Sequence, residues 1–175
     1  MPSSLGYEHP ELAAFLVHAD HVDVHRVRTD RALRPFIAAT FAYQPRWLTF
    51  LYAVRMGLVR LIGLHQDGVP APTRWRPEDV PMQPGADATF FTVKAAREEQ
   101  LWIAGVEERH LGATLAILRE PGGYALVTIV HYRHWTGRLY FNLIRPFHHL
   151  VVMAMGRAGA ADPTITSAPD HVRGR

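Results

Sequence analysis

His110 and Glu107 are the side chains whose type and spacing best suit proton transfer. They lie three positions apart ahead of an apolar stretch, and a carboxylate beside an imidazole can serve as an acid–base pair. We therefore predict His110 and Glu107 as the catalytic residues if the protein is an enzyme. The alternative is that Glu107 belongs to a turn and His110 caps the next strand, and the sequence leaves both open. No serine lies between Ser4 and Ser167, so a Ser-His-Asp triad is not supported.

The chain has 11 histidines and no cysteine, which excludes disulfides, thiol nucleophiles and thiolate metal ligands. Five of the histidines are expected near the corner between the last strand and a terminal helix: His110, His131, His134, His148 and His149. Strand alternation turns His131 and His134 to opposite faces, and the helical period separates His148 and His149 by about 100°. The sequence therefore predicts neither a metal site nor a cofactor.

Residues 138–151 have two faces at helical spacing. The apolar face comprises Tyr140, Leu143, Ile144, Phe147, Leu150 and Val151, and the polar face comprises Arg138, Asn142, Arg145 and His149. We predict a long C-terminal helix that packs its aromatic stripe on a sheet and is kinked at Pro146. The predicted ligand-binding residues are Trp75, as part of a lid, and Tyr132, Arg138, Tyr140, Asn142, Arg145 and Phe147. The alternative is that the polar face is only solvated.

Composition describes one domain with a substantial core, since the chain has 175 residues of which 48% are hydrophobic. Its 19 basic residues are mixed with 16 acidic ones, so no nucleic-acid partner is predicted. The N-terminus does not resemble a signal peptide, and we expect a cytoplasmic protein. Membrane binding is not expected, although residues 47–62 are apolar over most of a helical circumference and leave a peripheral association as a weaker alternative.

The pattern of elements predicts an α+β fold. We expect a short helix after Pro10, a strand at 21–28, helices at 30–43 and 46–63, a proline-rich loop at 65–86, strands at 88–95, 100–106, 111–119 and 124–131, and the terminal helix. The predicted architecture is a curved antiparallel sheet that grips the C-terminal helix, with two helices inserted after the first strand. The predicted organisation is an N-terminal segment at 1–19, one helix-grip domain at 20–156 and a disordered tail at 157–175.

Three segments, 57–64, 108–111 and above all 137–148, resemble a bacterial family, the domain of unknown function 2867. The resemblance extends from about Asp20 to Met155. Members of the family also occur attached to NAD-binding short-chain-dehydrogenase-like domains, which implies a protein partner of that kind. A relation to helix-grip, START-like binders of lipids and hormones is implied as an analogy of fold. The family commonly has His-Leu-Asp-Phe where this chain has His110-Leu-Gly-Ala113, so that carboxylate is missing here.

Three functions follow as hypotheses. The first is a cofactor-independent domain that binds a small, largely apolar molecule with an anionic end near Arg138 or Arg145. The second is an interaction module that docks on a short-chain-dehydrogenase-like protein or forms a homodimer. The third is a cofactor-independent enzyme of the cyclase or hydrolase type.

Overall fold

The computed structural model describes residues 9–51 and 74–161. Its centre is an open six-stranded sheet with the order β1-β6-β5-β4-β3-β2, in which all neighbouring strands are antiparallel. The strands are β1 (His21–Arg28), β2 (Asp87–Ala88), β3 (Phe91–Arg97), β4 (Leu101–Glu107), β5 (Leu111–Glu120) and β6 (Gly123–Tyr132). The fold is therefore α+β, as the sequence predicts.

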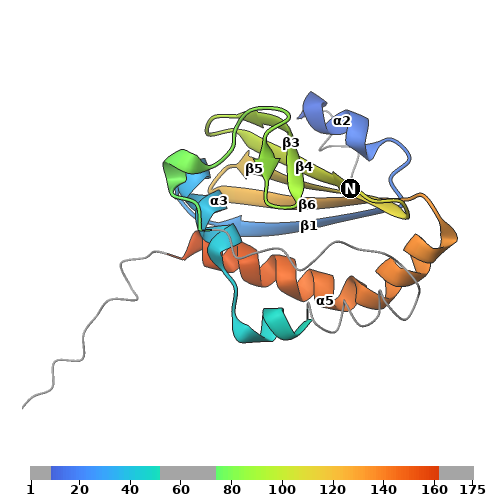
Figure 1. The fold of residues 1–175 in the computed structure, drawn as a ribbon. Helices are drawn as coiled ribbons and strands as arrows, with labels where there is room; N and C mark the ends of the chain where they lie inside the picture. The colour runs from blue at the N-terminus through green and yellow to red at the C-terminus, as the bar shows by residue number, and fades with distance from the viewer. Residues whose placement is uncertain (1–8, 52–73, 162–175) are drawn as a thin grey trace, which may run out of the picture.

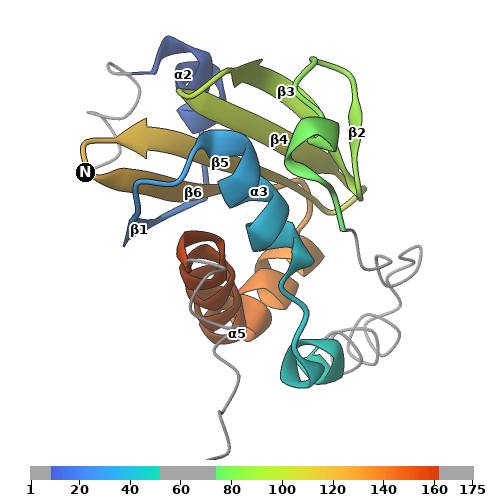
Figure 2. The same ribbon diagram turned by 90° about the vertical axis from the view of Figure 1, so that its left-hand side faces the viewer.

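Helices cover both faces of the sheet. Helix α2 (Pro10–Leu16) packs on one face, and α3 (Leu33–Ala42) and the long C-terminal helix α5 (Trp135–Ala160) lie on the other face, here called the inner face (Figures 1 and 2). Figure 1 shows α5 running alongside β1 and β6. The described residues include no helix that is both long and apolar enough to cross a bilayer.

Strand β6 shows why this sequence forms a sheet with two covered faces. Alternate side chains point to opposite faces, so Tyr124 and Leu126 join the core under α3 and α5, while Ala125 and Val127 join the core under α2. A strand buried on both faces is apolar without interruption, as residues 124–127 are. The hairpin turn that the sequence predicts before β6 is present. Glu120 pairs with Gly123, which leaves Pro121 and Gly122 as a two-residue loop.

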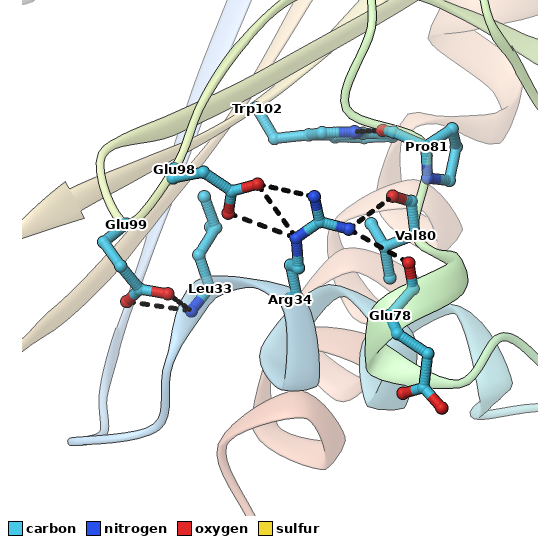
Figure 3. Close-up of polar contacts among 8 residues, drawn as sticks. All are labelled: Leu33, Arg34, Glu78, Val80, Pro81, Glu98, Glu99 and Trp102. Carbon is cyan, nitrogen blue, oxygen red and sulfur yellow. Dashed lines mark hydrogen bonds and ion pairs between the residues drawn. The ribbon is translucent and has the colours of Figure 1, made fainter.

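Arg34 joins the start of α3 to the β3–β4 hairpin (Figure 3). Its Nε lies 3.0 and 3.1 Å from the two carboxylate oxygens of Glu98, and its Nη1 donates to the carbonyls of Glu78 and Val80. The hydrogen bonds from Arg34 lower the pKa of Glu98. Through one guanidinium, three separate segments are therefore held together.

Two further contacts in the same region fix α3 and the segment before β2 (Figure 3). The Glu99 carboxylate accepts from the backbone N–H of Leu33 at the N-terminus of α3, where a negative charge is favourable. The buried Trp102 donates from Nε1 to the carbonyl of Pro81 at 2.8 Å. With its first turn anchored in this way, α3 directs Phe41 near its C-terminus toward the space beneath the sheet.

Three boundaries differ from the predicted ones, and a fourth lies outside the described residues. The strand predicted at 88–95 is β3 at 91–97, because Thr89 has φ 64° and turns the chain between β2 and β3. Helix α3 begins at Leu33 and so places Pro35 in its first turn. Of the helix predicted at 46–63, residues 46–51 are helical and the remainder lies outside the described residues. Helix α5 ends at Ala160, so residues 157–160 are helical although the sequence predicted a disordered tail from residue 157.

The inward face of α5 also differs from the predicted stripe. Tyr140 and Phe141 are buried, whereas Leu143, Phe147 and Leu150 are each about half exposed. The inner side keeps Ile144 and Val151 of the predicted stripe and adds His148 and Val152. The helix is thus turned so that a histidine faces the sheet and part of the predicted stripe faces outward.

Candidate functional site

A cavity of about 270 Å³ lies between the inner face of the sheet and α5. The sheet contributes Ala113 and Leu115 from β5, which pair with Val130 and Thr128 of β6 and therefore face the same side. Strand β5 lies in the middle of the sheet, yet Ala113 and Leu115 are only partly buried. Side chains in the middle of a covered sheet keep such exposure only where the covering layer does not reach them.

The wall opposite the sheet is mainly apolar. Helix α5 contributes Tyr140, Phe141, Ile144, Phe147, His148, Val151, Val152 and Met155, and Phe41, Tyr43, Leu48 and Leu51 close another side. Few polar groups reach the cavity, among them Thr128, Glu108 and His148. A mainly apolar cavity with a few polar groups is typical of small-molecule sites.

His148 is a partly buried polar group that crosses from α5 to the sheet. Its Nε2 lies 3.3 Å from Oγ1 of Thr128. Burial lowers the pKa of His148 to about 4, and the charge of His149 lowers it in the same direction, while Asp23 opposes the change. His148 is therefore a neutral imidazole near pH 7 and can offer a hydrogen bond inside the cavity without a charge.

The predicted ligand-binding residues are divided by the structure. Tyr140 and Phe147 line the cavity. Trp75 packs on Phe41, with 5.3 Å between ring centroids, and Tyr132 packs on Phe141 at 6.0 Å. Neither Trp75 nor Tyr132 is among the described cavity-lining residues.

The polar members of the predicted set, Arg138, Asn142 and Arg145, are exposed on α5 and are likewise absent from the described lining. Both arginines lie close enough to Tyr132 to act on it. Burial raises the pKa of Tyr132, the charge of Asp20 raises it further, and Arg138 and Arg145 oppose that rise. These residues thus form a separate polar group outside the cavity.

The predicted pair of His110 and Glu107 is not brought together. His110 is 5% exposed, and its Nε2 lies 3.2 Å from Oε2 of Glu108, the residue that follows Glu107. Glu107 ends β4 and forms an ion pair with Arg133 on the surface. Glu108 also lines the cavity, whereas Glu107 and His110 are not among its described lining residues, so an acid–base pair beside the cavity would consist of Glu108 and His110.

A second cluster, which we did not predict, lies between β1 and α5. Oδ2 of Asp23 is 2.7 Å from Nε2 of His25 and 2.7 Å from Nδ1 of His149, and these two nitrogens are 3.5 Å apart. His21 completes the surroundings, with its ring centroid 6.1 Å from that of His149 and 5.0 Å from that of Phe141. Burial lowers the pKa of His21, and the charge of Arg145 acts in the same direction.

The sequence carried a signal for this cluster. His21-Val-Asp-Val-His25 alternates polar and apolar residues, so the strand turns His21, Asp23 and His25 to one face and Val22 and Val24 to the other. Three side chains that can bind protons or metals on one face of a strand are unusual for a core-facing surface. Of the five histidines predicted to share a corner, only His148 and His149 are close to each other among the ring contacts in the described residues.

Comparison with known proteins identifies the family and nothing further. The chain matches no curated protein and no solved structure. Residues 15–155 match the family of proteins of unknown function named DUF2867, which confirms the predicted resemblance. The match begins at the end of α2 and spans the whole sheet, the cavity, the histidine cluster and most of α5. The chain therefore belongs to the DUF2867 family.

Proposed function

We propose that this chain is a domain of the helix-grip type that binds a small, largely apolar molecule between its sheet and α5. The observation that carries the proposal is the partial exposure of Ala113 and Leu115 to a cavity of about 270 Å³. Filling that space with another side chain would bury more apolar surface, at roughly 25 cal/mol per Å². An empty cavity beneath the middle of a sheet therefore lowers the stability of the folded protein. A ligand that fills the cavity would restore the missing apolar contacts.

The size of the cavity limits the ligand. An enclosed apolar cavity of about 150 Å³ holds a molecule as small as benzene, and pockets for drug-sized ligands span about 300–1,000 Å³. At about 270 Å³, the cavity suits a molecule between these sizes. A single aromatic ring with a short substituent or a short branched chain has the appropriate volume.

The polar lining suggests that the ligand has a neutral hydrogen-bonding group. Thr128 and the neutral His148 offer a donor and an acceptor side by side. The two guanidiniums that we expected to hold an anionic end, those of Arg138 and Arg145, are on the exposed side of α5. An alcohol, ketone or amide near His148 fits the cavity better than a buried carboxylate.

Native mass spectrometry tests the proposal. Under gentle ionisation, the wild-type protein incubated with a panel of small aromatic and branched aliphatic alcohols should retain one organic molecule that denaturing conditions remove. Ala113→Phe places a ring in the cavity and should abolish the adduct. The matched control is Ala14→Phe on the exposed side of α2, which should retain it. The proposal fails if wild type remains bare or if Ala113→Phe binds as wild type does.

A second candidate function is self-association through α5. Leu139, Leu143, Phe147 and Leu150 form a stripe at helical spacing, and each is about half exposed. Exposed apolar stripes of this kind often mark protein contacts. Light scattering after gel filtration should then show a dimer that Leu143→Glu dissociates and Asn142→Glu does not. A monomer at all concentrations would contradict this candidate. Docking on a short-chain-dehydrogenase-like protein stays a prediction from the family resemblance.

A further inference from the structure

We propose that Asp23, His25 and His149 bind one divalent transition-metal ion, such as Zn²⁺ or Fe²⁺. The three side chains come from two elements, β1 and α5, and each directs one ligand atom toward the others. The proposal is independent of the cavity ligand, because none of the three residues belongs to the described cavity lining.

The distances among the three atoms suit a metal. A triangle with sides of 2.7, 2.7 and 3.5 Å has a circumscribed circle of about 1.8 Å radius. Nitrogen and carboxylate ligands lie about 2.0–2.1 Å from Zn²⁺. An ion at that distance from all three atoms would sit about 1 Å out of their plane, by the same triangle. Three ligands on one side of an ion leave positions open on the other.

Hydrogen bonding accounts for only one of the three contacts, that between Nδ1 of His149 and Nε2 of His25 at 3.5 Å. Oδ2 of Asp23 is buried and has two imidazole nitrogens at 2.7 Å, yet neither contact has hydrogen-bond geometry, and no other partner occurs in the described part of the chain. A buried carboxylate oxygen without a hydrogen bond is costly. A cation held jointly by the oxygen and the two nitrogens would remove that cost.

The ligand atoms indicate the class of ion. Two imidazoles and one carboxylate suit zinc or non-haem iron, whereas Ca²⁺ and Mg²⁺ prefer oxygen ligands alone. The side chains of Asp23, His25 and His149 are 17%, 23% and 34% exposed, so an ion can reach them from solvent. Three protein ligands with open positions resemble catalytic rather than structural zinc sites.

Further aromatic and imidazole rings surround the three proposed ligands. The ring of His149 has those of His25, His21 and His148 as neighbours at 5.6, 6.1 and 6.5 Å between centroids. His148 and Phe141 line the cavity and also contact this group of rings. A metal at Asp23 would therefore lie near the cavity wall.

Metal titration tests the site. Purified full-length protein is stripped with a chelator, and binding of Zn²⁺ is measured by calorimetry and binding of Co²⁺ by visible absorption. We expect one ion per chain, with affinity at least tenfold weaker in Asp23→Asn and His149→Gln. His134→Gln, at an exposed histidine preceding α5, is the matched control and should bind as wild type does.

Thermal unfolding distinguishes a variant that has lost the metal site from one that does not fold. Zn²⁺ should raise the Tm of wild type and His134→Gln but not that of Asp23→Asn, which keeps nearly the same shape. If His149→Gln does not fold, His25→Gln replaces it. The proposal is overturned if wild type binds none of Zn²⁺, Co²⁺ and Fe²⁺ at micromolar concentration, or if Asp23→Asn binds them as wild type does.

Discussion

Replacing Gly137 with alanine should destabilise the protein because it forces α5 away from the sheet. A Cβ at this position would lie 2.2 Å from the carbonyl oxygen of His110 and 3.0 Å from its carbon. That carbonyl cannot easily yield, since it accepts the backbone N–H groups of Arg133 and His134 at 3.0 and 3.3 Å. Relief therefore requires the first turn of α5 to move by about 1 Å, given ordinary carbon–oxygen contacts near 3.3 Å.

The expected loss of stability is the cost of the steric clash and the weakened hydrogen bonds, minus the gain in helix propensity. Overpacking costs about 1–3 kcal/mol, and weakening the two hydrogen bonds at His110 adds about 0.5–1.5 kcal/mol for each bond lost. Alanine regains about 1 kcal/mol over glycine in a helix. The free energy of unfolding of Gly137→Ala should thus fall by about 1–5 kcal/mol, which for a chain of this size lowers the Tm by at least about 2–4 °C.

A second glycine of α5 provides the control. A Cβ at Gly156 would meet only side-chain methyl groups of Val27 and Leu126, at 3.2 to 3.5 Å. Gly156→Ala should therefore leave the free energy of unfolding within about 1 kcal/mol of wild type. Urea unfolding monitored by circular dichroism measures both variants. If Gly137→Ala is no less stable than Gly156→Ala, α5 does not start where the structure places it, and the cavity beneath it loses its support.

Three further predictions concern the anchors of the fold and the cavity. Trp102→Phe should lower the free energy of unfolding by about 1–2 kcal/mol, since it removes the hydrogen bond to Pro81 and leaves a partly buried carbonyl without its donor; urea unfolding measures this. Glu98→Gln should cost less than about 1 kcal/mol because that carboxylate is largely exposed, whereas Arg34→Met should cost more, since Arg34 also serves two backbone carbonyls; thermal unfolding of both variants compares them. In the presence of a chelator, the free energy of unfolding should fall as the pH drops from about 6.5 to 4. In this range His148 is protonated in the unfolded chain but remains neutral in the folded protein, and the loss can reach about 3 kcal/mol. Unfolding of His148→Gln across that range should show a smaller loss, and an equal loss would contradict the prediction.

The sheet was readable from the sequence because local patterns determine it. The alternation in residues 21–28 and the loop at Pro121 and Gly122 fix β1, β5 and β6 almost to the residue. The face of α5 was less readable. Apolar side chains surround much of that helix, so periodicity alone does not decide whether Phe141 or Leu143 points inward.

The two candidate sites show where reading the sequence reached its limit. The sequence favoured Glu107 as the neighbour of His110, whereas the structure places Glu108, just past the end of β4, beside His110 and pairs Glu107 with Arg133. The cluster at Asp23 joins His25 to His149, which are 124 positions apart, and no local pattern specifies such a pairing. Two of its three ligands, Asp23 and His25, nevertheless stand out in the polar–apolar alternation of residues 21–25.

The central claim is that the space between the sheet and α5 receives a small apolar molecule, and ligand-induced stabilisation measures this most directly. A ligand at 100 times its Kd adds about 2.7 kcal/mol to the stability of the folded state. For a chain of 175 residues this corresponds to about 5–10 °C in Tm. Thermal unfolding of wild type, Ala113→Phe and Ala14→Phe with the panel of small alcohols should show such a rise in wild type and Ala14→Phe but not in Ala113→Phe. No rise in wild type, or an equal rise in Ala113→Phe, would contradict the claim.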